Sequence, residues 1–164
     1  MFREMRRKKQ QLTQEETMVI LREGTSGVLS LTGDEGYPYG VPLSYVYDGD
    51  KLYFHCAKEG HKIDAIRKNP KASFCVIAQD EIVPEKYTTC YRSVIAFGSV
   101  RILENEGEKR RAIEELALKY APEDSEENRQ NYIEKDWEPL CMLEMTVEHL
   151  SGKEAIELVR RKQK

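Results

Sequence analysis

The first apolar run of the chain has helical spacing. Thr13 and Glu16 match a capping box, in which the two side chains satisfy free N–H groups at the start of a helix. The apolar residues Val19–Leu21 follow, and Gly24 is a residue type that commonly ends helices. We therefore expect a helix over about residues 13–23.

From residue 27 the apolar positions alternate with a period of two, which is typical of strands. Residues 27–32 form a β-rich run, and alternate apolar side chains then mark one long strand over residues 39–47. Asp48–Asp50 contains an Asp-Gly turn signal and is followed by a further alternating run at residues 51–56. These features predict a β-hairpin.

The second half of the chain contains both patterns. Asn69 precedes Pro70, a pairing that disfavours helix and therefore ends the short helix before it. Gly98 lies inside an alternating run and indicates a bulge or a close backbone approach. The predicted elements are a helix over 61–68, strands over 71–77 and 93–103, an amphipathic helix over 106–120, a polar loop or short helix over 123–135, and a strand over 141–147.

The total is about six strands, joined by hairpins and short turns, with helices at the edges. Hairpins imply antiparallel pairing, so we expect a mainly β fold, a small β-barrel with peripheral helices. A length of 164 residues is sufficient for one hydrophobic core. We expect a single domain, with the barrel over about 26–103 and 141–151 and a helical insertion over about 106–135.

The charges are nearly balanced, with 26 basic and 29 acidic residues, so nucleic acid is not an expected partner. The four cysteines, Cys56, Cys75, Cys90 and Cys141, show no CxxC or metal-type spacing. No stretch approaches the roughly 18 consecutive apolar residues of a membrane-spanning helix, and no apolar leader is visible. We expect a protein of the reducing cytoplasm without a membrane segment.

The segment Tyr53–Lys62 carries the strongest chemical signal. Here a strand runs through a polar turn directly into a helix. The N–H groups and dipole of a helix N-terminus attract anions, Gly60 allows the backbone to approach a ligand, and Lys62 adds a positive charge. The pattern predicts a phosphate site, and an ordinary strand-to-helix connection with a surface lysine is the competing interpretation.

Four residues suggest other chemistry. His55, Cys56 and His61 could bind zinc, although a strand places His55 and Cys56 on opposite faces. His55 could instead donate a proton, because histidine changes charge near neutral pH. Trp137 is expected to line a pocket or a subunit interface. The absence of a G-x-S-x-G elbow, a P-loop and a dinucleotide glycine pattern argues against hydrolase and Rossmann-type functions.

Four short motifs stand out: a Pro-Leu-Ser-Tyr strand at Pro42–Tyr45, a Tyr-Phe-His strand end at Tyr53–His55, a Gly-x-Lys turn at Gly60–Lys62 and a Tyr-x-Ser-Val strand at Tyr91–Val94. Together they resemble the pyridoxamine 5′-phosphate oxidase-like flavin-binding split-barrel family, and in particular its nitroimidazole-resistance subgroup. The resemblance covers about Gly24–Leu103 and extends more loosely to the region from Cys141 to Lys153.

This resemblance implies a split-barrel homodimer with FMN, or alternatively FAD, at the subunit interface. The residues that it assigns to the flavin ring are Leu43, Ser44, Tyr45, His55, Cys56 and Ala57. It assigns Lys58, Gly60, His61 and Lys62 to the phosphate, and Arg92, Ser93 and Val94 to the phosphate or the ribityl chain.

The function implied by the resemblance is an FMN-dependent oxidoreductase. Reduced flavin would pass electrons to a small molecule such as a 5-nitroimidazole-type nitroaromatic, with His55 as the catalytic proton donor or substrate contact. The alternative is a non-catalytic flavin- or haem-binding protein that stores or senses its ligand. The tail Glu154–Lys164 lacks the arginine and histidine pattern that pyridoxamine 5′-phosphate oxidases use for their substrate, so that activity is not expected.

Overall fold

The computed structural model describes all residues from 1 to 164 and contains one antiparallel sheet with helices around it. The sheet order is β2-β1-β5-β6-β7-β4-β3, and every pairing in it is antiparallel. This confirms the predicted mainly β class. The strands are β1 (Ser26–Thr32), β2 (Pro38–Ser44), β3 (Val46–Asp48), β4 (Lys51–Ala57), β5 (Lys71–Val83), β6 (Thr88–Ile102) and β7 (Leu140–Glu154).

The structure has seven strands where the sequence predicted about six, because the long strand expected over residues 39–47 is divided at Tyr45. β2 pairs with β1 and β3 pairs with β4, and these two pairs form opposite edges of the sheet. Since β2 and β3 follow each other in the chain, the sheet must curl until its edges meet at Tyr45. The result is a barrel with an open seam. The period-two pattern runs through the break, so the sequence does not reveal it.

The seam is fixed by hydrogen bonds to Tyr45. Its hydroxyl donates to the Leu21 carbonyl oxygen at 2.7 Å, and its backbone N–H donates to the Tyr120 hydroxyl at 3.3 Å. The Lys119 ammonium donates to the Tyr45 carbonyl oxygen at 3.1 Å and lies 4.3 Å from the centroid of its ring. Burial lowers the pKa of Lys119. These contacts attach the end of a helix to the point where the barrel edges meet.

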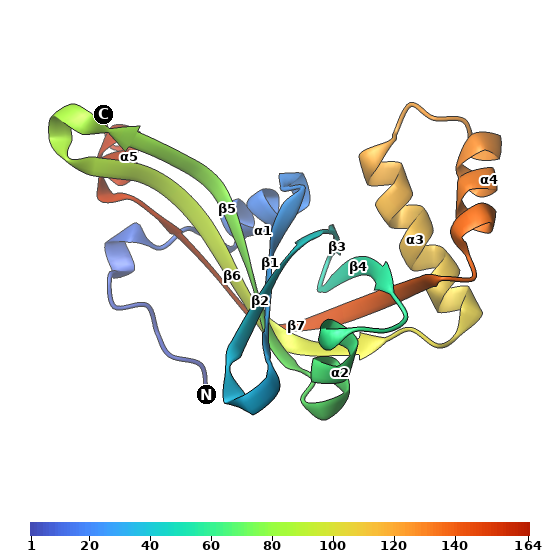
Figure 1. Cartoon of the computed structure of the whole chain (residues 1–164). Coiled ribbons are helices and arrows are strands. Elements are labelled where there is room, and N and C mark those ends of the chain that lie inside the picture. Colours follow the sequence, from blue (N-terminus) through green and yellow to red (C-terminus); the bar gives the residue numbers. More distant parts are fainter.

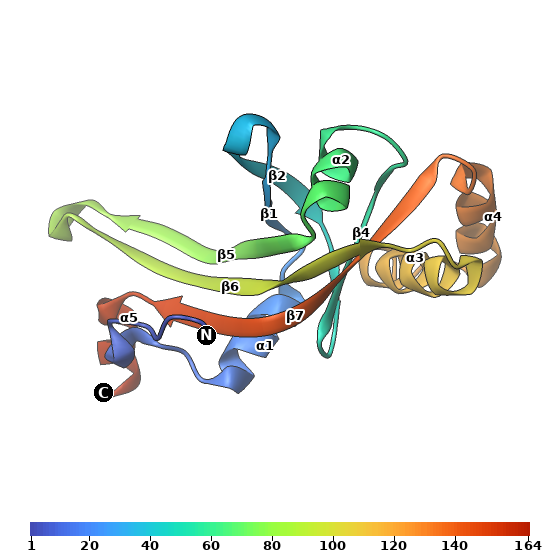
Figure 2. The same ribbon diagram turned by 90° about the horizontal axis from the view of Figure 1, so that it is seen from below.

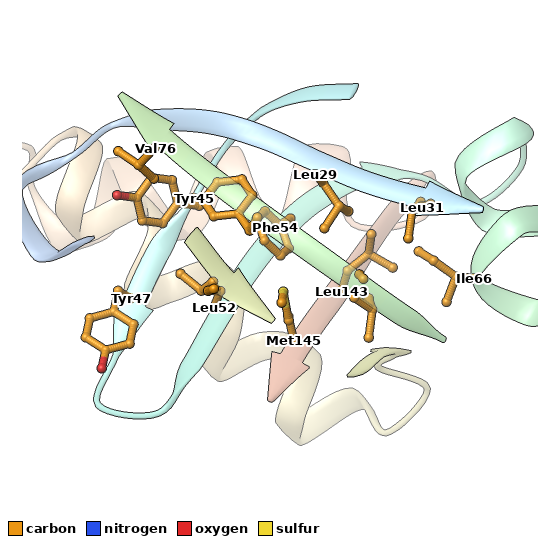
Figure 3. Packing of buried hydrophobic residues seen from close by; sticks show 14 of the residues in the cluster. Leu29, Leu31, Tyr45, Tyr47, Leu52, Phe54, Ile66, Val76, Leu143 and Met145 are labelled. Atoms are coloured by element: carbon orange, nitrogen blue, oxygen red, sulfur yellow. The ribbon is translucent and has the colours of Figure 1, made fainter. Parts of the chain in front are cut away.

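The barrel interior holds the main hydrophobic core, which Figure 3 shows between the strands. Phe74 from β5 contacts Tyr45 and Phe54 edge to face, with ring centroids 4.9 Å and 5.0 Å apart. All three side chains are fully buried. Aromatic pairs in this arrangement contribute about 0.5–1.5 kcal/mol beyond their buried area. Side chains from β4, from β5 and from the junction between β2 and β3 therefore meet in one tightly packed centre.

The helices lie outside the barrel. They are α1 (Gln14–Glu23), α2 (His61–Lys68), α3 (Glu106–Tyr120), α4 (Glu126–Asp136) and α5 (Ile156–Lys162), together with 3-10 turns at Lys8–Gln10, Asp34–Gly36 and Pro84–Lys86. The predicted capping box at Thr13 and Glu16 is present, which confirms the start of α1. The segment predicted as a polar loop or short helix forms α4, which is capped by Ser125.

The strands β5, β6 and β7 are longer than predicted. Figures 1 and 2 show β5 and β6 as a hairpin arm that extends away from the side of the molecule that carries α3 and α4. Residues 78–92 are mostly polar or exposed and show no clear alternation. In this arm β5 pairs with β6, and β6 pairs with the end of β7. This pairing extends the sheet into residues whose sequence pattern does not predict strands.

Gly98 confirms the expectation of a bulge and a close backbone approach. The register between β6 and β7 shifts between Phe97 and Gly98. A Cβ atom at Gly98 would collide with the carbonyl oxygen of Thr146 on β7. A glycine is required here because two backbones touch.

Candidate functional site

The candidate anion site is the turn between β4 and α2. β4 ends at Ala57, and α2 starts at His61 after a short link. Gly60 is the N-cap residue of α2, with φ 126° and ψ 175°, a conformation that is essentially restricted to glycine. No side chain caps this helix. Its first N–H groups are therefore available to an external acceptor, and the helix dipole favours an anion.

Charged side chains surround this turn. Lys62 is half-buried and makes no salt bridge, whereas Lys58 lies 3.8 Å from Glu138. Asp64 in the first turn of α2 opposes an anion. The structure thus brings the predicted phosphate residues Lys58, Gly60, His61 and Lys62 together around one helix start.

The His61 ring faces the turn between β1 and β2. It stacks on Tyr39 with ring centroids 4.0 Å apart, and its Nε2 lies 3.8 Å from Asp34 Oδ2. Stacking on Tyr39 holds the ring in place beside the Asp34 carboxylate. His61 would therefore reach a bound anion mainly through its backbone N–H, while its side chain closes one side of the turn.

His55 lies on the outer face of β4, exposed, with no side-chain hydrogen bond. It lines two adjoining cavities of about 430 and 300 Å³, which together we call the His55 groove. The groove lies between β4 and the helices α3 and α4. Besides His55 it is lined by Ser44, Ile113, Leu116, Ala117, Tyr120, Ala121, Asp124, Arg129, Tyr132, Ile133, Asp136 and Leu140. Most of these residues are apolar or aromatic, so the groove suits a flat apolar ligand with a few polar groups.

Ser44 and His55, which the family resemblance assigns to the flavin ring, come from separate strands and line the same part of the groove. Ala57 is exposed at the end of β4, close to the start of α2. Leu43 is half-buried and packs against the barrel core. The strand β4 therefore connects the groove at His55 with the helix start at Gly60.

Tyr45 is not positioned to contact a ligand, which corrects its assignment to the flavin ring. Its side chain is fully buried, and both its N–H and its carbonyl are used by α3. Burial also raises the pKa of its hydroxyl. Cys56 faces the barrel core, on the side of β4 opposite His55. Only its backbone could contact a ligand in the groove.

Arg92, Ser93 and Val94 do not join the other predicted residues within one chain. Ser99 of β6 pairs with Lys71, which closely follows α2, whereas Ser93 lies six positions farther along the strand. At about 3.3 Å per residue this is roughly 20 Å. Arg92 instead lies 3.1 Å from Glu154 and lines a cavity beside α1. Val94 is fully buried, so its assignment to the ribityl chain or phosphate is not supported by its side chain.

Trp137 lines a cavity, but a different one from the His55 groove. This Trp137 cavity, of about 440 Å³, shares only Leu140 with the groove. The Lys109 ammonium lies 4.1 Å from the centroid of the Trp137 ring and donates to its carbonyl oxygen at 3.0 Å. Trp137 thus lines a cavity, whereas its place in a substrate pocket or a subunit interface stays a prediction, and the residues that cover His55 come from α3 and α4.

The groove residues of α3 and α4 were not predicted from the sequence. Ile113, Ala117 and Tyr120 lie on the predicted apolar stripe of α3, which was interpreted only as a packing surface. Tyr132 and Arg129 lie in the segment predicted as a polar loop or short helix. The one available signal was this stripe, from which Ala112 and Leu116 are buried in a cluster with Leu103 and Met142 while Ala117 and Tyr120 line the groove.

The structure contains no group of three or more His, Cys, Asp or Glu side chains arranged to hold a metal ion. The zinc alternative at His55, Cys56 and His61 is therefore not supported. Cys56 and His55 point to opposite faces of β4, and His61 turns toward Tyr39. None of the helices is long and apolar enough to span a membrane.

The fold and the site together define an antiparallel barrel that carries an apolar ligand groove beside an uncapped helix start. The model of the pyridoxamine 5′-phosphate oxidase family matches residues 13–154, and the chain belongs to that family. A search of curated protein sequences finds no match.

Solved structures share this fold. A candidate 5-nitroimidazole antibiotic resistance protein from Bacteroides thetaiotaomicron is 22% identical, with a TM-score of 0.72 over 87% of this chain and 85% of that chain. A FAD-binding protein from Mesorhizobium loti is 26% identical, with a TM-score of 0.64 over 88% and 96% of the two chains. A FAD and heme binding protein from Mycobacterium smegmatis is 18% identical, with a TM-score of 0.69 over 90% and 73%.

Proposed function

We propose that this protein binds FMN and passes electrons from the reduced flavin to a small nitroaromatic molecule of the 5-nitroimidazole type. The observation that carries the proposal is the position of β4, which ends between the His55 groove and the helix start at Gly60. A ligand with a flat ring at one end and a phosphate at the other matches these two features. The family membership and the flavin-binding solved structures of the same fold support it.

The residues present are suited to this cofactor. Gly60 leaves the N–H groups at the start of α2 accessible to the phosphate, and Lys62 has no carboxylate partner that would compete for its charge. Charge-assisted hydrogen bonds of this kind are roughly twice as strong as neutral ones. Bound at this site, the flavin would supply the electrons for reduction.

His55 is proposed as the proton donor or substrate contact. It is the histidine that lines both parts of the groove, and its imidazole makes no hydrogen bond to another side chain. Tyr120 and Tyr132 supply aromatic walls for a flat acceptor, and α3 and α4 shield it from water. The groove would hold the substrate while His55 provides a proton.

The test begins with the cofactor extracted from protein purified without added flavin. Release of FMN is expected, and release of FAD would change the assigned cofactor to FAD.

The reduced protein is then mixed with a 5-nitroimidazole, and reoxidation of the flavin and the amine product are measured. His55→Ala should lower turnover without abolishing flavin binding, whereas Asn131→Ala, which alters an exposed side chain of α4, should not. Absence of reoxidation in the wild-type protein would contradict the nitroreductase activity.

We also propose that the protein is a homodimer in which each flavin site uses both chains. Within one chain, Arg92 lines a cavity beside α1 rather than the His55 groove, and Ser93 lies six positions along β6 from the residue that pairs with Lys71. The outer face of β1, β5 and β6 exposes apolar side chains, with exposed fractions of 39% for Val28, 68% for Ile77 and 39% for Ile95. Contiguous apolar surface of this kind supports association with a second copy.

Light scattering tests the dimer. Ile95→Glu should convert the dimer to a monomer and weaken flavin binding, because it buries a charge in the interface. Leu118→Glu, on α3 outside this face, is the matched control and should leave both properties unchanged. A wild-type monomer that holds flavin would exclude the shared site.

The second candidate function is a haem- or flavin-binding protein without turnover. The exposed imidazole of His55 beside an apolar groove favours it, because histidine is a common axial ligand of haem iron. Titration with haem distinguishes the two functions. A haem spectrum that is lost in His55→Ala would support the second function. If the wild-type protein does not bind haem, the haem-binding function is excluded.

A further inference from the structure

Cys56 and Cys141 face each other across neighbouring strands. Cys56 on β4 pairs directly with Cys141 on β7, so both side chains lie on the same face of the sheet. Residues that are directly opposite in an antiparallel pair have Cα atoms about 4.5–5.5 Å apart. This is within the range of about 4.4–6.8 Å that a disulfide requires. Both thiols are free in the structure.

The other two cysteines have no such partner. Cys75 on β5 pairs with Val28 and with Ile95. Cys90 on β6 pairs with Glu81 and lies 3.9 Å from the Arg161 guanidinium. The chain therefore contains one dithiol and two isolated thiols, which makes it possible to compare them within the same molecule.

Cys141 is the member of the dithiol that lines the Trp137 cavity. Charged groups from every neighbouring element face this cavity. The cations are Lys58 after β4, Arg67 of α2 and Lys109 of α3, while Lys62 acts on Cys56. The carboxylates are Glu104 before α3, Glu106 of α3 and Glu138 after α4. The Glu138 carboxylate lies 3.8 Å from the Lys58 ammonium.

The surroundings favour a thiolate at Cys141. The neighbouring Cys56 thiol and the nearby cations Lys109, Arg67 and Lys58 lower the pKa of Cys141. The neighbouring Cys141 thiol and burial raise the pKa of Cys56. Lys109 is held in place by the Trp137 carbonyl oxygen, so its charge stays close to the cavity. The two thiols therefore have unequal roles, with Cys141 as the nucleophile and Cys56 as the proton-bearing partner.

We propose that Cys141 and Cys56 form a redox-active dithiol that a hydroperoxide entering the Trp137 cavity converts to a disulfide. The Cys141 thiolate attacks one peroxide oxygen, the O–O bond breaks, and the alkoxide or hydroxide leaves with a proton as alcohol or water. Cys141 is then a sulfenic acid. The Cys56 sulfur attacks the Cys141 sulfur, the S–S bond forms, and the displaced hydroxide leaves as water with the Cys56 proton. In total, two thiols and one hydroperoxide give one disulfide, one alcohol or water, and one water.

The location gives this reaction a consequence for the molecule. Cys56 lies between His55 and Ala57 on β4, and β4 leads into the turn at Gly60. A disulfide to Cys141 would attach this strand end covalently to β7. Oxidation of the dithiol would thus restrict the movement of the end of β4, whether or not a flavin is bound.

The test treats the full-length protein with hydrogen peroxide and then alkylates and digests it for mass spectrometry. The expected product is a cross-linked peptide pair containing Cys56 and Cys141, with the loss of two hydrogen atoms. In Cys56→Ser, a sulfenic acid at Cys141 should persist and react with dimedone. In Cys141→Ser, oxidation of Cys56 should be roughly tenfold slower or more, because the thiolate is the nucleophile.

Matched variants make the outcome decisive. The double variant Cys75→Ser, Cys90→Ser should form the disulfide at the wild-type rate. Lys109→Met should slow the reaction of Cys141 severalfold and move its alkylation profile to higher pH, and circular dichroism checks that each variant is folded. The proposal is overturned if wild-type protein forms no Cys56–Cys141 disulfide, or if Cys75 or Cys90 is oxidised as fast as Cys141.

Discussion

The hydroxyl of Tyr45 donates a 2.7 Å hydrogen bond to the carbonyl oxygen of Leu21, and both residues are fully buried. Leu21 lies in the last turn of α1, where carbonyl groups lack a helical partner. The bond therefore completes the end of α1 and attaches it to the barrel seam between β2 and β3.

Tyr45→Phe removes this donor and leaves the Leu21 carbonyl buried without it. We expect the free energy of unfolding to fall by about 1–3 kcal/mol. Urea denaturation followed by circular dichroism measures the change. Tyr87→Phe is the control, because the Tyr87 side chain is 99% exposed. Equal stability of Tyr45→Phe and wild type would show that the bond contributes nothing.

Gly98→Ala should be among the most destabilising single changes in the barrel. The added methyl group would collide with the Thr146 backbone, which cannot move aside as a flexible side chain could. Separation of β6 from β7 is expected to cost about 3 kcal/mol or more, measured by thermal unfolding. Gly107→Ala provides the comparison. Gly107 lies in the first turn of α3, where alanine should be neutral or stabilise by up to about 1 kcal/mol.

Gly60→Ala tests the helix start as a phosphate site. At φ 126° an alanine is strained by about 1–3 kcal/mol, so the turn is expected to change shape. FMN affinity should fall roughly tenfold, which corresponds to about 1.4 kcal/mol, as measured by fluorescence titration. Gly49→Ala also places alanine at a positive φ, 63°, but in the turn between β3 and β4. It should cost stability without changing affinity, and an equal loss of affinity in both variants would refute the assignment.

The docking of α5 should depend on pH. The Lys162 ammonium lies 2.6 Å from Glu16 and 2.8 Å from Glu154, a carboxylate that is only 5% exposed. The hydrogen bond from Lys162 is the main cause of the lowered pKa of Glu16. A lowered carboxyl pKa gives stability that is present above the unfolded pKa of about 4.5 and is lost as the pH falls through the folded value.

The protection factors of the α5 amides, which correct for the pH dependence of intrinsic exchange, should therefore be high at neutral pH and fall in acid well below pH 4.5. Lys162→Ala should show rapid exchange already at neutral pH, with a cost of roughly 1 kcal/mol because the ammonium is partly exposed. Lys164→Ala serves as control. If α5 of Lys162→Ala is as protected as that of the wild type, the ion pairs do not hold the helix.

The amino-acid sequence determined the local elements and one part of the site. Features that act through residues close in sequence could be read directly: the capping box at Thr13, the break at Asn69–Pro70 and the apolar stripe of α3. Gly98 could be read because it acts through backbone sterics. The turn at Gly60 could likewise be predicted as an anion site from its own residues.

The tertiary structure decided what depends on residues far apart in the chain. Tyr45 follows the strand pattern, yet the barrel buries it at a seam because α1 and α3 take up its polar groups. The groove at His55 exists only because α3 and α4 fold over β4. Likewise, Cys56 and Cys141 are 85 positions apart in the sequence and meet through strand register. Contacts of this kind leave no periodic signal, since each partner satisfies its own local pattern.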